Sequence, residues 1–213
     1  MHPNRIFVTG TGTDIGKTYV SAILTEALHA DYWKPVQAGD LDNSDTIQVA
    51  RLLSNGMARV HPEAHRLTEA MSPHVAAYMD KVEIDYKLFP FPKTERILIV
   101  ETAGGLHSPM TANATMADFV QHCDLPVILI SNNYLGSINH TLMSVEVMKA
   151  RGIKLLGIIM NGEQNNSSES FIEEYSGLPI IAHIPRFDQL THEKITQQAL
   201  IIQTALRQKT GHE

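Results

Sequence analysis

One glycine-rich segment of the sequence contains the residue types needed to bind phosphate groups. Residues 10–18 read GTGTDIGKT, and they lie between a short apolar run and a longer stretch with helical spacing. A turn between a strand and a helix aims backbone N–H groups and the positive helix N-terminus at an anion. Lys17 would then reach the terminal phosphates of a nucleotide, and the Thr18 hydroxyl would bind Mg²⁺. The segment predicts a nucleoside triphosphate site, although five residues separate Gly10 from Gly16, one more than in the strict motif.

The same glycines also fit a different site, the dinucleotide-binding turn. Gly10, Gly12 and Gly16 resemble the glycines of that turn, which needs an acidic residue at the end of the second strand to bind the ribose. Here the second strand-like run ends in YWKP at residues 32–35, without an acid. Lys17 would also have no role in such a site. The sequence therefore favours a triphosphate over a dinucleotide.

Two acidic residues are candidates for binding the metal that accompanies a triphosphate. Mg²⁺ prefers a hydroxyl, one or two carboxylates and phosphate oxygens as ligands. Glu101 closes the apolar run 97–100, and a buried acid is costly unless it is paired or bound to a metal. Asp45 lies just before a predicted helix, where it could equally be an ordinary helix cap. Glu101 is the stronger candidate for a metal ligand. The sequence does not decide whether Asp45 binds the metal or caps the helix.

Further positions at strand ends carry groups that could contact a nucleotide or a substrate. Lys34 could stabilise charge that develops during phosphoryl transfer, or it could be a solvated surface lysine. Asn161 and Gly162 could bind a base through the side-chain amide, or they could form a plain turn. The segment 135–140 would present backbone N–H groups at the start of a helix. These residues alone do not decide between the alternatives.

The elements expected to position these residues are short apolar strands that alternate with helices. Strands that are apolar on both faces indicate a parallel sheet, and the alternation indicates right-handed βαβ units. We therefore predict an α/β fold, a three-layer, doubly wound and mostly parallel sheet flanked by helices, which binds ligands at the carboxyl ends of its strands. Strands are expected at 5–9, 32–36, 96–101, 126–131, 155–160 and 179–184, and helices at 17–29, 45–53, 115–122, 139–150 and 190–207.

Composition narrows the class of protein without indicating a function. The chain has 213 residues and a formal net charge of −6, and its length suits a single domain, 1–213. The acidic balance argues against a nucleic-acid partner, and no apolar run is long enough to cross a membrane. The single cysteine, Cys123, indicates a reducing, cytoplasmic location and is expected to pack at a helix end. The eleven histidines show no metal-binding spacing, and His61 and His65 are expected on the solvated face of a helix.

Taken in order, several short motifs resemble the dethiobiotin synthetase family of P-loop enzymes. The resemblance covers residues 7–185, and although each motif is weak alone, their order is specific. The motifs are VTG at 8–10, GKT at 16–18, KPV at 34–36, NSD at 43–45, SPH at 72–74, VE at 100–101, AGG at 103–105, LPVIL at 125–129, LG at 135–136, INH at 138–140 and IP at 184–185.

The resemblance implies a P-loop NTPase-like ligase of biotin synthesis, a homodimer that converts 7,8-diaminononanoate, CO₂ and ATP to dethiobiotin with Mg²⁺ as cofactor. The diamine would form a carbamate, ATP would phosphorylate it, and the second amine would close the ureido ring. Lys17 and Lys34 would be catalytic, and Mg²⁺ would be bound by Thr18, Asp45 and Glu101. Substrate would contact Thr13 and Lys34 and, across the dimer interface, Gly136, Ser137, Ile138 and Asn139. The nucleotide would be bound by Thr13, Asp14, Ile15, Gly16, Lys17, Thr18, Tyr19, Asp45, Glu101, Thr102, Ala103, Gly104, Asn161, Gly162, Pro185, Arg186 and Phe187.

Three positions depart from the family pattern, one of them Gly162, where an acid is common, and two other functions compete with the ligase. Ala38 and Thr102 stand where a hydroxyl-bearing residue and a glycine are usual, and Ala38 removes a possible contact to substrate. A switch ATPase of the partitioning or metal-insertion kind is the main alternative. Such switches usually carry a second lysine at the start of the phosphate loop, and residues 9–13 contain none. A small-molecule kinase would not explain Lys34 together with the segment 136–139.

Overall fold

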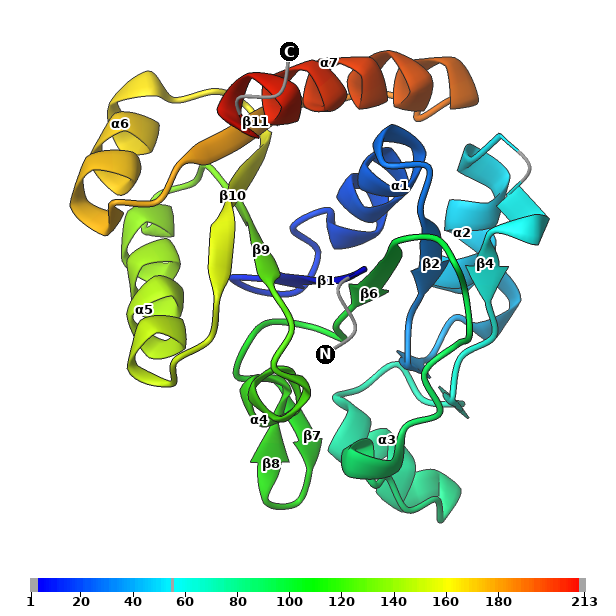
Figure 1. Ribbon diagram of the computed structural model, residues 1–213. Coiled ribbons are helices and arrows are strands. Elements are labelled where there is room, and N and C mark those ends of the chain that lie inside the picture. Colours follow the sequence, from blue (N-terminus) through cyan, green and yellow to red (C-terminus); the bar gives the residue numbers. More distant parts are fainter. Residues whose placement is uncertain (1–3, 55, 211–213) are drawn as a thin grey trace.

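Seven parallel strands form the central sheet of the computed structural model, which describes residues 4–54 and 56–210. From one edge to the other, their order is β11-β10-β9-β1-β6-β2-β4 (Figure 1). Two short pairs lie outside this sheet, β3 with β5 and β7 with β8. The strands are β1 (Arg5–Gly10), β2 (Asp31–Trp33), β3 (Val36–Ala38), β4 (Val60–His61), β5 (His65–Leu67), β6 (Leu98–Glu101), β7 (Pro109–Thr111), β8 (Ala114–Thr115), β9 (Val127–Asn132), β10 (Leu155–Gly162) and β11 (Ile180–Pro185).

Helices cover both faces of the sheet, and each face has its own apolar core. Residues of α1, α2 and α7 pack in one core, and residues of α3, α4, α5 and α6 pack in the other. Figure 1 shows α1 and α7 on one side of β1 and α4 on the opposite side. The predicted three-layer, doubly wound α/β fold is therefore confirmed. The helices are α1 (Lys17–Ala27), α2 (Asp45–Leu52), α3 (Pro73–Asp80), α4 (Met116–Cys123), α5 (Ser137–Ala150), α6 (Asn166–Ser176) and α7 (His192–Thr210), with 3₁₀ turns η1 (Leu41–Asn43), η2 (Gly56–Ala58) and η3 (Tyr86–Leu88).

The alternation of side chains along each strand explains the two cores. Successive residues of a strand point to opposite faces. In β6, Ile99 belongs to the core beneath α1, whereas Leu98 and Val100 belong to the core on the other face. Glu101, two residues after Ile99, therefore returns to the face that α1 covers. This register places a carboxylate beside the start of α1.

The predicted phosphate loop begins at the centre of the sheet, where the direction of strand addition reverses. β1 pairs with β6 on one side and with β9 on the other. The strands β2 and β4 lie beyond β6, whereas β10 and β11 lie beyond β9. Doubly wound sheets bind ligands outside the carboxyl ends of their strands at such a reversal. The carboxyl end of β1 is Gly10, the first residue of the predicted loop.

Three features differ from the sequence expectations. The strand predicted at 32–36 is interrupted, because Pro35 has no N–H to continue the ladder, and β2 and β3 belong to separate sheets. The helix predicted around His61 and His65 is wrong, since these residues lie in the strands β4 and β5. The helices α3 and α6 were not predicted. The first is only eight residues long, and the second, NSSESFIEEYS, has few apolar residues to reveal a helical period.

The single cysteine packs at a helix end, as predicted. Cys123 is the last residue of α4 and lies partly buried against the core. Burial raises the pKa of its thiol to about 12, so the thiolate form is rare at neutral pH. Within the described residues, no helix is both long enough and apolar enough to span a membrane.

One buried arginine connects the end of α1 to the segment before β4. Arg59 is 7% exposed, and its Nη2 donates to the carbonyl oxygen of Thr25. Its Nε also donates to the carbonyl of Ala30 at 3.0 Å, and Nη1 donates to the Glu26 carboxylate at 3.0 Å. Because a guanidinium holds its donors in a fixed planar fork, one side chain serves all three acceptors. The carboxyl end of α1 and the approach to β4 are therefore fixed together.

We expect Arg59→Ala to lower the free energy of unfolding by about 3 kcal/mol, because Glu26 loses its buried charge partner. Arg151→Ala provides the comparison, since Arg151 pairs with Asp118 at 2.9 Å where both side chains are partly exposed. Its loss should cost less than about 1 kcal/mol. Urea unfolding of both variants measures the difference. Equal losses would contradict the role given to the buried guanidinium.

Candidate functional site

The phosphate loop is held in place by the turn that follows β6. The Leu106 N–H donates to the carbonyl oxygen of Gly10 at 3.1 Å. A Cβ added at Gly105 would lie 3.0 Å from the Cα of Gly12, so the two backbones are in close contact there. Only a residue without a side chain permits such an approach. The ends of β1 and β6 therefore position the loop jointly.

The last residue of the loop must be glycine for two reasons. Gly16 has a φ of +88°, which L side chains rarely adopt. A Cβ at this position would also lie 2.2 Å from Nδ2 of Asn161, which donates to the carbonyl oxygen of Ile15 at 2.9 Å. The side chain of Asn161 thus connects the end of β10 to the phosphate loop. One donor of its amide is already used by this contact.

We expect Gly16→Ala to weaken ATP binding by about tenfold or more, since the strained φ costs roughly 1–3 kcal/mol and the new Cβ displaces the Asn161 amide. Gly177→Ala is the matched control, because Gly177 has a φ of +66° at the end of α6 and has nothing within 4 Å of an added Cβ. This control should lower stability and leave ATP binding unchanged. Calorimetric titration with ATP tests both variants, and an unaltered affinity in Gly16→Ala would contradict the expectation.

Lys17 is the first residue of α1, and its side chain folds back over the phosphate loop. Its Nζ donates to the carbonyl oxygen of Gly12 at 2.8 Å. Burial lowers the pKa of Lys17 to about 8, although the nearby Glu101 carboxylate acts in the opposite direction. The ammonium is therefore held at the concave side of the loop, where the backbone N–H groups of a helix start also favour an anion.

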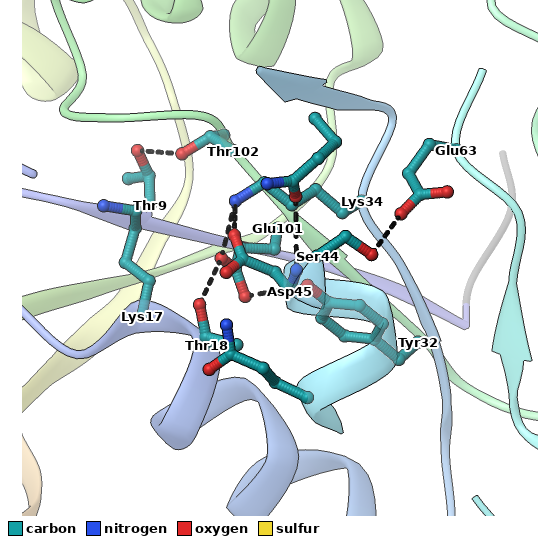
Figure 2. Close-up of polar contacts among 12 residues, drawn as sticks. Thr9, Lys17, Thr18, Tyr32, Lys34, Ser44, Asp45, Glu63, Glu101 and Thr102 are labelled. Atoms are coloured by element: carbon teal, nitrogen blue, oxygen red, sulfur yellow. Dashed lines mark hydrogen bonds and ion pairs between the residues drawn. The ribbon is translucent and has the colours of Figure 1, made fainter. Parts of the chain in front are cut away.

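Lys34 lies between two carboxylates at the carboxyl edge of the sheet (Figure 2). Its Nζ forms ion pairs with Oδ2 of Asp45 and, at 3.2 Å, with Oε1 of Glu101. The Thr18 hydroxyl donates to the same Glu101 oxygen at 3.2 Å. Lys34 is only 6% exposed, so the structure excludes the solvated surface lysine. Side chains from α1, α2, β6 and the end of β2 converge at this point.

Burial and the neighbouring charges have opposite effects on the pKa of Lys34. Burial alone would lower the pKa of Lys34, but Glu101 and Asp45 outweigh it and raise the pKa above its ordinary value. Lys34 is therefore an ammonium at neutral pH. Tyr32, on the neighbouring strand, donates to Oε2 of Glu101 at 3.1 Å. Burial, followed by the nearby carboxylates, raises the pKa of this phenol well above its usual range, so it remains a neutral donor.

The structure also separates the two roles that the sequence leaves open for Asp45. Ser44 is the N-cap of α2, and its hydroxyl oxygen accepts from the backbone N–H of Ile47 at 3.4 Å. The Ser44 hydroxyl in turn donates to Glu63 at 3.0 Å, as Figure 2 shows. Asp45 directs its carboxylate to Lys34 instead. The capping role therefore belongs to Ser44, and the Asp45 carboxylate belongs to the cluster.

The oxygen atoms of the cluster form a donor set that fits Mg²⁺ in the presence of a nucleotide. Asp45, Glu101 and Thr18 supply two carboxylates and a hydroxyl, and a cationic ammonium already lies between the carboxylates. Within the part of the chain that the structure describes, no three His, Cys, Asp or Glu side chains gather where they could hold a metal. Mg²⁺ usually combines one or two carboxylates with phosphate oxygens. The set is therefore suited to a metal that arrives with a triphosphate.

A cavity of about 920 Å³ joins the phosphate loop to this cluster and extends to the ends of β10 and β11. Its volume lies within the range typical of small-molecule sites. Asn161 and Gly162 line the far wall together with the segment 185–187. The structure thus brings together most of the residues singled out in the sequence: Thr13, Asp14, Gly16, Lys17, Thr18, Tyr19, Lys34, Asp45, Glu101, Gly104, Asn161, Gly162, Pro185, Arg186 and Phe187.

Other residues singled out in the sequence lie away from the cavity. The side chain of Ile15 is buried in the core beneath α1. Thr102 is also buried, and its hydroxyl donates to the hydroxyl of Thr9 at 2.9 Å (Figure 2). Ala103 packs against the core on the other face. The segment 136–139, at the start of α5, does not line this cavity either.

Several cavity residues were not singled out from the sequence. Asn132 is the last residue of β9, and Asn133 follows it. Glu101 was found because it is a polar residue at the carboxyl end of a buried strand, and the same rule could have found these two residues. Ile184 belongs to the IP motif at 184–185 but was not singled out as a site residue, and no motif indicates the others. The full set is Gln37, Asp40, Gln48, Asn132, Asn133, Glu163, Ile184 and Leu190.

Solved structures with the same architecture include a ParA family ATPase and a septum site-determining protein. A ParA family ATPase from Chlorobium tepidum matches with a TM-score of 0.55 and 15% identity, covering 97% of this chain and 93% of that one. The septum site-determining protein MinD from Pyrococcus horikoshii, complexed with Mg-ADP, matches with a TM-score of 0.57 and 16% identity, covering 93% and 88%. At these identities the likeness shows the P-loop fold alone.

Comparison by sequence is more specific. A family model described as an AAA domain matches residues 4–194. An ATP-dependent dethiobiotin synthetase BioD from Christiangramia forsetii is 44% identical, with coverage of 92% of this chain and 96% of that protein. A second, from Cytophaga hutchinsonii, is also 44% identical and covers 92% and 95%. On the strength of these matches, this chain belongs to the ATP-dependent dethiobiotin synthetase family.

Proposed function

We propose that this protein, an ATP-dependent ligase of biotin biosynthesis by family, closes the ureido ring of dethiobiotin from 7,8-diaminononanoate and CO₂. The position of Lys34 carries the proposal: its ammonium is buried beside Asp45 and Glu101 in the cavity of the phosphate loop. Lys17 and Thr18 already suffice for the phosphates of a nucleotide. A second buried ammonium is needed where an anionic substrate must approach a triphosphate, because the two negative charges repel each other.

The proposed reaction has three steps and needs no further reactant. One amine of the diamine adds to CO₂, which gives a carbamate and releases a proton. A carbamate oxygen then attacks the γ-phosphorus of ATP, ADP leaves, and a carbamic-phosphoric anhydride forms. The second amine attacks the carbamate carbon and loses a proton, the bond from that carbon to the phosphate oxygen breaks, and the ring closes with release of phosphate.

The residues of the cavity would act by positioning and by charge stabilisation, as is usual for phosphoryl transfer. Lys17 and the loop N–H groups would bind the triphosphate, and Lys34 would bind the carbamate and the phosphoryl group in transfer. Mg²⁺, held by Thr18, Asp45 and Glu101, would supply neutralisation of phosphate charge. Lys34 lines the cavity, and its ammonium has three N–H donors for two carboxylate partners, so that one donor would remain for the substrate.

We propose further that a second copy of the chain completes the substrate site. The segment 136–139 begins α5, where backbone N–H groups of a helix start can bind a carboxylate, although the N–H of Ser137 already donates to the carbonyl oxygen of Tyr134. The segment lies outside the cavity. Leu135 beside it is fully exposed, and Tyr134 and Met143 are also exposed. Apolar side chains gathered in this way favour burial against another protein surface. A homodimer would bring this segment of one subunit to the cavity of the other.

The second candidate function is a nucleotide-dependent switch. It rests on the fold shared with the ParA and MinD proteins, at 15% and 16% identity. The absence of a second lysine in the sequence 9–13 and the buried ammonium of Lys34 favour the ligase. The two functions differ in whether the diamine is needed for phosphate release.

The test is an assay of the purified protein with ATP, Mg²⁺, bicarbonate and the diamine. Phosphate release is measured by colorimetry and the cyclic urea by mass spectrometry. We expect both products to appear together and to require the diamine. Phosphate release that is indifferent to the diamine, without urea formation, would overturn the ligase proposal and favour the switch.

A further inference from the structure

A buried tyrosine lies behind the carboxylate of Glu101 and has no part in the reaction as proposed above. Tyr32 is completely buried in the middle of β2, which pairs with β6 so that Tyr32 lies opposite Ile99. Both residues belong to the core beneath α1. Two residues further along each strand, Lys34 and Glu101 are therefore expected on the same side of the sheet. The phenol therefore lies on the same face of the sheet as the charged cluster, two residues before Lys34 along the chain.

The hydrogen bonds of Glu101 divide its two oxygens between different partners. Oε1 accepts from Thr18 and from Lys34, each at 3.2 Å. Oε2 accepts from the phenol of Tyr32 at 3.1 Å, and Figure 2 shows the tyrosine on the far side of the carboxylate from Thr18. One oxygen is thus turned toward the cavity, while the other is held within the protein.

The hydroxyl of Tyr32 serves no other evident purpose. A buried hydroxyl costs free energy unless it is hydrogen-bonded, and phenylalanine would fill the same space without that cost. The described contacts give this hydroxyl one partner, Glu101. A donor that reaches a charged carboxylate forms one of the stronger classes of hydrogen bond. The contact therefore fixes the rotation of the Glu101 side chain.

We propose that Tyr32 is a positioning residue for metal binding, because its phenol holds Glu101 with Oε1 facing the cavity. The proposal rests on the function given above, in which Glu101 is a ligand of Mg²⁺. Without the phenol, the carboxylate is free to turn both oxygens toward Lys34 and Thr18. Outer partners that orient a metal ligand commonly change metal affinity by about 10- to 100-fold when they are removed.

The variant Tyr32→Phe tests this role, since it removes a single oxygen atom and retains the ring. Binding of ATP is titrated by calorimetry at a series of Mg²⁺ concentrations and again in excess EDTA. We expect the Mg²⁺ concentration for half-maximal enhancement of ATP binding to rise about tenfold. ATP affinity in EDTA should stay unchanged. A merely structural role would lower the midpoint of thermal unfolding and leave the Mg²⁺ dependence as it is.

Tyr86→Phe is the matched control. Tyr86 lies in η3, where its ring contacts Phe119 and His122, and it does not line the nucleotide cavity. This variant also removes one phenolic oxygen, so it should reproduce the wild-type Mg²⁺ dependence. If Tyr32→Phe and Tyr86→Phe give the same Mg²⁺ titration as the wild type, the positioning role of Tyr32 is overturned.

A double-mutant cycle with Glu101→Gln shows whether Tyr32 acts through that carboxylate. Glu101→Gln alone should raise the Mg²⁺ concentration needed for half-maximal enhancement of ATP binding. Adding Tyr32→Phe to this variant should raise it little further, because the effects of coupled residues are not additive. Independent, additive effects would overturn the proposal. If Glu101→Gln and Asp45→Asn both keep the wild-type Mg²⁺ dependence, the metal site itself fails. If both variants need more Mg²⁺ than the wild type, as expected, but Tyr32→Phe has no effect, only the inference about Tyr32 is overturned.

Discussion

Lys34→Gln should abolish ring closure, with kcat reduced by about 10³-fold and the affinity for ATP changed by less than about threefold, as expected for a group that acts on developing charge. The glutamine amide can still donate a hydrogen bond, but it has no charge to offset the anions of carbamate and triphosphate. Lys17 and the loop N–H groups remain for the nucleotide. Steady-state kinetics and calorimetry measure the two quantities separately. Near-normal turnover would remove Lys34 from the mechanism.

The same variant has an expected signature in stability. In the absence of metal, Asp45 and Glu101 lose the ammonium that lies between them. Breaking a buried pair in this way costs about 3–5 kcal/mol. We therefore expect the thermal midpoint of Lys34→Gln to fall in EDTA and to stay below that of the wild type on addition of Mg²⁺ and ATP, because nearly equal affinity for ATP gives nearly equal stabilisation by the ligand. Lys87→Gln, a change at an exposed lysine, should show neither effect.

Asn139→Asp should raise the KM for the diamine by about 10- to 100-fold and leave the KM for ATP unchanged, because the new charge repels a carboxylate at the start of α5 at short range. Asn139 is exposed in the first turn of this helix. A negative charge there stabilises the helix through its dipole, so the protein should fold normally. Asn166→Asp, the same substitution in the first turn of α6, is the control for the added charge. Equal effects of the two substitutions on the diamine KM would contradict a substrate-binding role.

The proposed homodimer, if it forms, allows a further test of the same substitution. If the segment 136–139 serves the cavity of the other subunit, a dimer of one Lys34→Gln chain and one Asn139→Asp chain contains one intact site. At a diamine concentration well below the raised KM of Asn139→Asp, random mixing of the two impaired proteins should then restore about a quarter of the wild-type activity, since half of the dimers are mixed and each has one intact site of two. Failure of the mixture to exceed either variant would indicate a site built within one chain.

The sequence was sufficient to place the cavity, because strand ends and loop glycines follow local rules. Glu101 closes an apolar run and Gly16-Lys17 opens a helix, so both were expected at the same edge of the sheet, where the structure has them. The contacts within the cluster could not be predicted in this way. The ion pairs of Lys34 depend on the packing of α2 against β2, and sequence spacing carries no information on that packing.

The role of Asp45 could not be predicted from the sequence either. Ser44 and Asp45 are both suitable helix caps, and adjacent positions cannot be ranked from residue type. The backbone of Ser44 is extended, with φ −56° and ψ 159°, whereas Asp45 is already helical. Only this one-residue difference decides which side chain caps the helix and which reaches Lys34. Likewise, the break at Pro35 follows from a known rule, but the separation of β3 from the central sheet does not.

The hydroxyl pair of Thr9 and Thr102 has a consequence for the variation of related sequences. Both side chains are buried and each satisfies the other, across the boundary between β1 and the residue that follows β6. A glycine in place of Thr102 would leave the Thr9 hydroxyl without this partner, and an apolar residue in place of Thr9 would do the same to Thr102. We therefore expect these two positions to covary in an alignment of the family. A search pattern that requires glycine after the glutamate would overlook chains that, like this one, carry the threonine pair.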